Sequence, residues 1–244
     1  MAAERALMAT AFEQARPELV RYLAKIVVRL DVAEELAQKA AVRALEHLES
    51  APSDPDGVRR WLFRIATNLA LDERKRHGAW RETLVHDVKE HAKRDLRHQA
   101  RLSKMAGSPE LRTIAREHMS FCFACTLGRL PSDQAAVLLL REVFGFDRSQ
   151  TAEILGCDPV TVKNRLQQAR RATREAYADT CALVTKRGVC YQCAELDGLY
   201  AKSPARDPLH GAADRLEARL RVVRDQPPAT WTRWLTELLA SLES

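Results

Sequence analysis

The sequence predicts an all-α protein made of two helical lobes, a charged linker between them and a helical C-terminal extension. Glycine and proline are scarce, at 9 and 10 of 244 residues, and aromatic residues reach only 6%. Alanine, leucine, arginine and glutamate dominate, and these residues favour helices. Apolar residues also recur at steps of three and four, the spacing of one buried helical face.

The expected first lobe spans residues 10–76, the linker 77–110, the second lobe 111–177 and the extension 178–244. The linker is dense in charged side chains and poor in large apolar ones, which is typical of a solvated connector. A length of 244 residues fits between one and two domains of typical size, ~150 residues each. We therefore expect two compact lobes joined by the linker.

Three helices are expected in the first lobe. Apolar positions predict one over residues 12–29 and a second after Asp31, and two prolines and a glycine then predict a loop over 50–57. The third helix, over residues 58–76, has one apolar side and six basic side chains elsewhere. The basic residues are Arg59, Arg60, Arg64, Arg74, Lys75 and Arg76. One helix is thus expected to carry both core contacts and a basic surface.

The second lobe is expected to contain a helix-turn-helix. A short helix from Ser149 is followed by Gly156 in the turn, and Asp158 with Pro159 is a typical start for the next helix. That next helix carries amide and basic side chains that can read base edges in DNA and hold phosphates. These are Lys163, Asn164, Arg165, Gln167, Gln168 and Arg171. The alternative is a solvated basic helix on an ordinary bundle.

The composition narrows the class of protein. With 39 basic against 33 acidic residues the formal net charge is +6, and hydrophobic residues make up 46%. This balance excludes a collagen-like or low-complexity chain and argues against wholesale disorder. The longest aliphatic run, Ala135 to Leu140, is far shorter than the ~20 residues that cross a bilayer, and no apolar segment follows Glu4 and Arg5. We expect a cytoplasmic protein without a membrane partner.

Two sets of motifs resemble the extracytoplasmic-function (ECF) sigma factors of the sigma-70 family. In the second lobe, Leu130-Pro131, the run 152–156 and the run 161–163 resemble region 4 of that family. In the first lobe, the run 33–36 and above all the run 61–72 resemble region 2, in the correct order along the chain. Because the two sets are independent and a linker separates them, a chance match is improbable.

The resemblance implies a sigma factor that is not an enzyme. Its partners would be core RNA polymerase and the −35 and −10 elements of promoter DNA. By position, Asn68 lies where the family captures a base extruded from the melted −10 element, within a basic surface. The helix with Glu34, Glu35 and Gln38 matches the one that docks on the clamp of the polymerase. Lys39 departs from the family, which usually has an acidic residue there, and predicts a retuned polymerase contact.

Five of the six cysteines form a further pattern of two CxxC pairs and one preceding cysteine. They are Cys122, Cys125, Cys190, Cys193 and Cys181. Two pairs can supply the four thiolates of a tetrahedral site for Zn²⁺ or another soft metal ion, with Cys181 or His118 as an exchangeable ligand. The same thiols could instead form a disulfide switch or be small buried hydrophobes. Cys157, in the turn of the helix-turn-helix, is expected to pack in the core.

The C-terminal extension loosely resembles that of sigma factors whose cysteine-rich tail senses metal in place of a separate anti-sigma factor. Such a factor remains open as a further partner. The main alternative function is a stand-alone helix-turn-helix regulator that binds DNA without polymerase, which would have no need of the melting motif at 61–72. A thiol oxidoreductase is a third class, but the chain lacks the βαβ pattern that such an enzyme requires.

Overall fold

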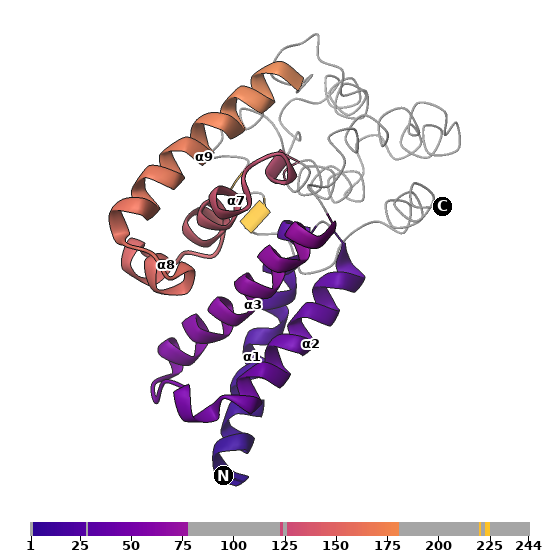
Figure 1. The fold of residues 1–244 in the computed structure, drawn as a ribbon, viewed down its shortest axis with the longest axis vertical. Coiled ribbons are helices and arrows are strands. Elements are labelled where there is room, and N and C mark those ends of the chain that lie inside the picture. The colour runs from indigo at the N-terminus through magenta and orange to yellow at the C-terminus, as the bar shows by residue number, and fades with distance from the viewer. Residues whose placement is uncertain are drawn as a thin grey trace, which may run out of the picture. The chain divides into compact units, whose positions relative to one another are not determined.

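The structure is a computed structural model in which helices are the only regular elements of the described part (Figure 1). The described residues are 2–27, 29–77, 123, 126–180, 220, 223 and 224. The all-α fold class predicted from the sequence is confirmed for these ranges. Most of the expected linker and C-terminal extension lies outside them.

The first helices form a three-helix arrangement in which each helix packs against the other two. They are α1 (Ala2–Val27), α2 (Leu30–Glu46) and α3 (Pro55–His77), and the short 3-10 helix η1 (Leu48–Ser50) follows α2. Their shared core is fully buried and is built around Leu19, Leu23, Leu36 and Leu62. It also holds a polar contact, because the Tyr22 hydroxyl lies 2.8 Å from the Thr67 hydroxyl.

Helix α3 begins earlier than the sequence predicts. The expected loop over residues 50–57 ends at Asp54, and α3 begins at Pro55. Proline suits the first turn of a helix, since its missing N–H would have no intrahelical partner there. The Asp54 carboxylate then accepts a hydrogen bond of 2.7 Å from the Gly57 N–H, which gives the helix a side-chain cap.

The later helices are α7 (Ser132–Leu138), α8 (Arg148–Leu155) and α9 (Pro159–Thr180). Helix α7 runs directly into the π-helical turn η2 (Leu139–Val143), which is closed by a hydrogen bond of 3.0 Å from the Phe144 N–H to the Leu139 carbonyl. A π-helical turn holds one residue more per hydrogen-bonded ring than an α-helix does. It brings Phe144 and Phe146 to the buried side of the segment.

The predicted helix-turn-helix is confirmed as α8 and α9. Helix α8 ends at Leu155 and is capped by Gly156, whose φ of 61° is the left-handed conformation that glycine tolerates best. Helix α9 begins with the Asp158 carboxylate accepting hydrogen bonds from the N–H groups of Val160 and Thr161, at 2.9 and 2.8 Å. Cys157 packs between them, as predicted, against a core of Val137, Ala152 and Val162.

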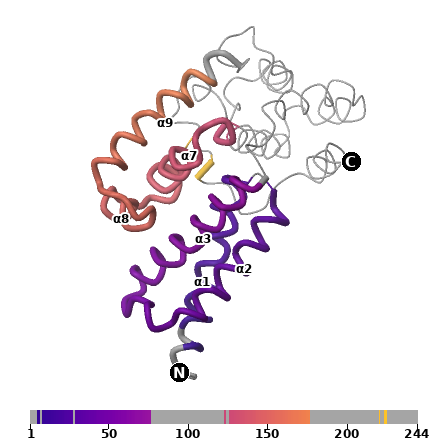
Figure 2. The backbone as a smooth tube through the Cα atoms, in the orientation of Figure 1, coloured from indigo at the N-terminus to yellow at the C-terminus, as the bar shows by residue number. Residues whose placement is uncertain are grey.

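Helices α1 and α3 pack against α7, and α3 also packs against α8, within a compact unit of residues 1–80, 127–169 and 227–229 (Figure 2). Four aromatic rings lie at this packing surface: those of Tyr22, Phe63, Phe144 and Phe146. The Phe63 and Phe146 ring centroids are 4.8 Å apart in an edge-to-face arrangement, a favourable geometry for aromatic pairs. The helices expected in two lobes thus share an apolar contact in this unit.

A second compact unit contains residues 81–126, 170–226 and 230–244. Its described residues include the end of α9, where Thr173 is fully buried, and the buried side chains of Phe123, Leu220 and Val223. Across all described helices, none combines the length and the apolar character that a membrane span needs.

Candidate nucleic-acid and polymerase interfaces

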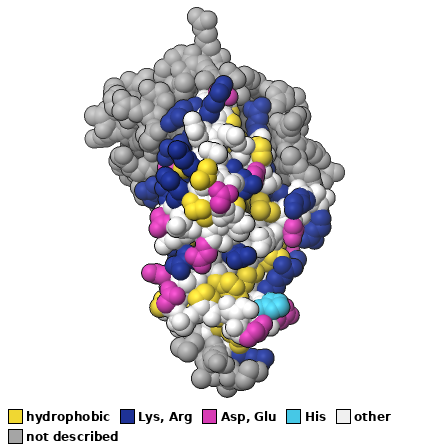
Figure 3. All heavy atoms as spheres, turned by 60° about the vertical axis from the view of Figure 1, so that its left-hand side comes forward, with side chains coloured by type: hydrophobic (Ala, Val, Ile, Leu, Met, Phe, Trp, Pro, Cys, Tyr) yellow, Lys and Arg dark blue, Asp and Glu magenta, His cyan; other side chains and the backbone are white. Residues whose placement is uncertain are grey.

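Helix α9 has one buried face and one exposed face. The buried face contains Val162, Ala169 and Thr173, at steps of seven and four residues. The exposed face carries most of the side chains that the sequence predicts to contact DNA. Its exposed members are Lys163, Asn164, Gln167, Gln168 and Arg171. On the face of the molecule shown in Figure 3, basic side chains lie interspersed with acidic ones rather than in a single block.

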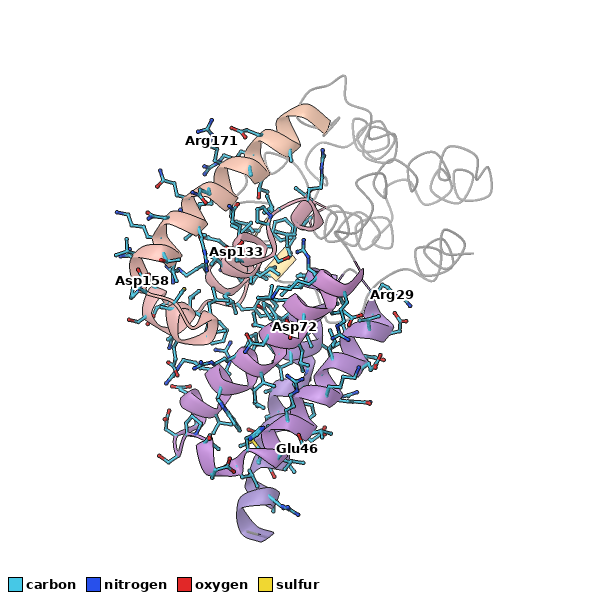
Figure 4. The ribbon with its side chains drawn as sticks, in the orientation of Figure 1. Arg29, Glu46, Asp72, Asp133, Asp158 and Arg171 are labelled. Atoms are coloured by element: carbon cyan, nitrogen blue, oxygen red, sulfur yellow. The ribbon has the colours of Figure 1, made fainter. Side chains whose placement is uncertain are left out.

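Three of the predicted DNA-contacting side chains on α9 already have polar partners. Arg165 Nε lies 2.8 Å from a carboxylate oxygen of Asp133, and Gln168 accepts a hydrogen bond of 3.0 Å from Gln134. Both partners belong to α7, so these two contacts hold α9 against that helix. Arg171 projects from the opposite side of α9, where its Nε lies 2.8 Å from Glu175 (Figure 4). The Glu175 carboxylate raises the pKa of Arg171.

The remaining three, Lys163, Asn164 and Gln167, have no polar partner among the described residues. All three are exposed and lie at steps of one and three residues on the same side of α9. A lysine ammonium and two side-chain amides supply donors and acceptors for base edges and phosphates. These three are therefore the side chains best placed to meet an outside partner.

Helix α3 presents a different picture, because its first two arginines are held by neighbouring groups. The Arg59 guanidinium forms a bidentate pair with Glu18, at 2.6 and 2.8 Å, and its carbon lies 4.1 Å from the centroid of the Phe146 ring. The Arg60 Nε lies 2.7 Å from a carboxylate oxygen of Glu153 on α8. Both side chains are thus occupied in packing α3 against its surroundings.

Arg74 does not lie on the exposed basic surface that the sequence predicts for α3. Its side chain is only 7% exposed, and one terminal nitrogen donates to the carbonyls of Gly128 and Leu130, at 3.0 and 3.1 Å. The other terminal nitrogen is buried and has no hydrogen-bond partner among the described residues. Burial lowers the pKa of this guanidinium. Through these hydrogen bonds Arg74 joins α3 to the segment before α7. It supplies donors to two backbone carbonyls of that segment.

Among the side chains of α3 that the sequence predicts to contact DNA, the exposed ones are Arg64, Asn68, Lys75 and Arg76. Lys75 and Arg76 form only loose pairs with Asp72 and Glu73, at 3.6 and 3.7 Å. Asn68 lies one turn after Arg64 and has no polar partner among the described residues. Its neighbour Thr67 points into the core, where its hydroxyl donates to the Phe63 carbonyl at 2.6 Å. The backbone of α3 is therefore anchored directly beside the exposed Asn68.

Helix α2 carries the residues predicted to contact polymerase, and Glu34, Glu35 and Gln38 are all exposed. Lys39, the departure from the family pattern, pairs with Glu35 at 2.6 Å. Sequence analysis missed two neighbours: Val42 is 54% exposed and Leu45 is 37% exposed. Both fall on the same helical face as Gln38, at steps of four and three. This pair adds apolar area to the exposed face of α2.

The predicted metal ligands lie outside the described residues. These are Cys122, Cys125, Cys181, Cys190 and Cys193, together with His118. Cys157 is the one cysteine that the structure describes; it is a free thiol whose pKa burial raises. Within the described ranges no three His, Cys, Asp or Glu side chains cluster as metal ligands would. The metal site therefore stays a prediction.

Known proteins resemble the chain in both halves. The family described as Sigma-70 region 2 matches residues 11–80, and the family described as Sigma-70, region 4 matches residues 120–172. The ECF RNA polymerase sigma factor SigL of Mycobacterium tuberculosis is 28% identical over 176 residues, which is 71% of this chain and 90% of that protein. The ECF RNA polymerase sigma factor EcfG of Rhodopseudomonas palustris is 31% identical over 156 residues, covering 63% of this chain and 76% of that protein. The RNA polymerase sigma-H factor of Pseudomonas aeruginosa is 29% identical over 151 residues, covering 59% and 72%.

Proposed function

The chain belongs to the ECF sigma factors of the sigma-70 family, and from that premise we propose which of its residues carry the function. As a sigma factor it binds core RNA polymerase and directs promoter recognition and transcription initiation, and it is not an enzyme. The sigma factor interpretation of the sequence is thereby confirmed over a stand-alone DNA-binding regulator. The residues that touch each partner are the proposal.

Recognition of the −35 element is assigned to the exposed face of α9. Lys163, Asn164 and Gln167 would contact base edges and phosphates, because they are exposed and have no polar partner among the described residues. Arg171 would contact a phosphate, since its exposed guanidinium can exchange Glu175 for another anion. Arg165 and Gln168 would act through α7, holding α9 in position for the contact.

Capture of a −10 base is assigned to Asn68 on α3, with Arg64, Lys75 and Arg76 providing phosphate contacts around it. The support is the exposure of all four side chains and the anchoring of Thr67 in the core beside Asn68. A flipped base is read through hydrogen bonds to its pairing edge, and an asparagine amide offers both a donor and an acceptor. We assign Arg59, Arg60 and Arg74 to contacts within the protein instead of contacts with DNA.

Polymerase binding is assigned to the exposed face of α2. Glu35 and Gln38 supply polar contacts, and Val42 and Leu45 extend that face with apolar area. Pairing with Lys39 lowers the charge that Glu35 offers a partner. Interfaces of this kind combine a desolvated apolar centre with a polar rim.

Metal or redox control through the cysteines outside the described residues is a further part of the proposal. It rests on the spacing of Cys122 with Cys125 and of Cys190 with Cys193. Zn²⁺ or another soft ion would suit four thiolates. A separate anti-sigma factor as a partner and a cytoplasmic location, where polymerase meets the chromosome, complete the proposal.

Run-off transcription with core polymerase tests the proposed assignments together. The full chain should give transcripts from a defined start, and core polymerase alone should give none. Transcription lost on chelation and restored by Zn²⁺ would support the metal proposal, whereas transcription unchanged by chelator and by oxidant would contradict cysteine control. Promoter binding without any run-off product would contradict the placement of polymerase contacts on α2.

A further inference from the structure

Val160 is an exposed apolar side chain at the start of α9. Its exposed fraction is 64%, the largest among the large apolar side chains of the described residues. The other exposed members of that group, Val42 and Leu45, lie on α2. Solitary exposed apolar residues are common on protein surfaces, so exposure alone carries no function. The position of Val160 on α9 is what indicates a function for this side chain.

Val160 lies on the same side of α9 as the groups assigned to the −35 element. Lys163, Asn164 and Gln167 follow it at steps of three, four and seven residues, which in an α-helix form one stripe. The core side of α9 is occupied by Val162 and Ala169 instead. Val160 therefore cannot turn into the core, and it is the apolar end of an otherwise polar stripe.

The local structure holds Val160 in a fixed position. Pro159 sets the backbone before it, and the Asp158 carboxylate accepts hydrogen bonds from the N–H groups of Val160 and Thr161. The Thr161 hydroxyl donates to the second oxygen of the same carboxylate. A valine in a helix is confined almost entirely to one side-chain rotamer. Its two methyl groups are thus presented with little freedom to lose on binding.

The chemistry of the DNA major groove identifies the partner. In a helix-turn-helix the first residues of the second helix meet the base edges. Most groups that base pairs present there are hydrogen-bond donors or acceptors, and the C5-methyl of thymine is the one methyl group among them. We infer that Val160 contacts the C5-methyl of a thymine in the −35 element and so helps to specify that base. The inference rests on the proposed function, because it requires the exposed face of α9 to enter the groove.

Removing single methyl groups from the DNA tests this contact. The holoenzyme, assembled from core polymerase and the full chain, first selects a promoter from duplexes randomised in the −35 region. Each −35 thymine is then replaced in turn by deoxyuridine, which lacks only the C5-methyl. At one thymine the wild-type holoenzyme should lose about fourfold in affinity, as expected for one buried methyl-sized group.

The variants link that loss to Val160. Val160→Ala holoenzyme should bind the thymine and deoxyuridine duplexes equally at that position, and Val160→Thr, which keeps one methyl group, should lie between. Alanine favours a helix, so the substitution preserves α9. Deoxyuridine in the spacer should leave binding unchanged for every protein.

Two other outcomes separate this inference from the proposed function. If Lys163→Ala weakens −35 binding but Val160→Ala keeps the wild-type response to deoxyuridine at every thymine, the methyl contact is wrong and the placement of α9 stands. If neither Lys163→Ala nor Val160→Ala changes −35 binding, both the contact and the proposed interface are overturned. A selected element without any thymine on either strand would also overturn the contact.

Discussion

Helices α3 and α9 both carry several basic side chains, yet the protein uses them differently. On α3, Arg59, Arg60 and Arg74 are bound to Glu18, Glu153 and two backbone carbonyls. On α9, Lys163 has no polar partner among the described residues, and Arg171 is paired only within its own helix. The number of cations on a helix therefore does not measure the charge that it offers to DNA. The cations that are already paired with neighbouring groups in the protein have to be left out of the count.

The basic side chains of the two regions also differ in how deeply they are buried. The cations of the three-helix arrangement include Lys25, which is 5% exposed, and Arg74, which is 7% exposed. Arg171 is exposed and its ion pair lies in solvent. Burying a charge carries a desolvation penalty of several kcal/mol, whereas an exposed ion pair contributes about 0–1 kcal/mol. Substitutions in the first group should change stability, and those in the second should change DNA binding.

The largest effect is expected from pH at Lys25. Burial, and next to it the charge of Arg21, lowers the pKa of Lys25 to about 8 from 10.5. Between these values the unfolded chain holds a proton that the folded protein has released, so stability rises with pH, by about 2 kcal/mol from pH 8 to 9.5. Urea unfolding at several pH values measures this. The Lys25→Met variant should be more stable than the wild type at pH 7.5, by roughly 3 kcal/mol, and its stability should not rise between pH 8 and 9.5. An equal rise in the variant would mean that other groups cause it.

The second effect concerns Arg74 on α3 against Arg171 on α9. Arg74→Met leaves the Gly128 and Leu130 carbonyls without their donor, and the free energy of unfolding should fall by about 2 kcal/mol. Arg171→Met removes an exposed ion pair and should leave the free energy of unfolding close to the wild-type value. Denaturant midpoints of the two variants give the comparison directly. Equal losses would show that burial does not distinguish the two arginines.

The third effect is on DNA. Lys163→Ala with Gln167→Ala should weaken −35 binding by the holoenzyme by about 1–2 kcal/mol. Loss of a lysine contact to phosphate should also lower the slope of log affinity against log salt by about one. Titrations on a −35 panel at several salt concentrations measure both quantities. Arg165→Ala serves as the matched control. Because Arg165 is paired with Asp133, this variant should change the slope of log affinity against log salt much less.

A fourth, smaller effect returns to α3. Asn68→Ala should reduce permanganate reactivity of −10 thymines in the open complex about tenfold, as expected when roughly 1.4 kcal/mol of base contact is lost. Polymerase binding, measured by co-purification, should stay as in the wild type, because α2 is untouched. Thr67 is unsuitable as a control, since its hydroxyl is part of the core. Wild-type reactivity in the Asn68 variant would remove this residue from the −10 site.

The smallest effect is expected at the pair of Arg60 with Glu153. This contact joins α3 to α8 at 2.7 Å, but Glu153 is 48% exposed. A double-mutant cycle with Arg60→Ala and Glu153→Ala should give a coupling of about 0.5 kcal/mol that fades at 1 M salt. A coupling above about 2 kcal/mol would place Arg60 with the buried cations rather than with the exposed ones.

What sequence analysis could predict depends on how local the chemistry is. The helix-turn-helix was predictable because Gly156, Asp158 and Pro159 act on their own turn of chain. The partners of Arg59, Arg60 and Arg74 were not, since Glu18, Glu153 and Gly128 lie 41, 93 and 54 residues away. The start of α3 fell between these cases. Pro55 fits a loop and a first helical turn equally well, and only the hydrogen bond from Gly57 to Asp54 decides it.

The π-helical turn at Leu139–Val143 makes the length of this segment as important as its composition. An α-helix advances 100° per residue, so if the same residues formed ordinary α-helix, everything after this turn would be rotated by about that angle. Phe144 and Phe146 would then leave the rings of Tyr22 and Phe63. The chain could keep every apolar residue and still lose the contact. In an alignment of relatives, a gap of one residue at this place would therefore indicate an ordinary α-helical turn that keeps the following residues in phase.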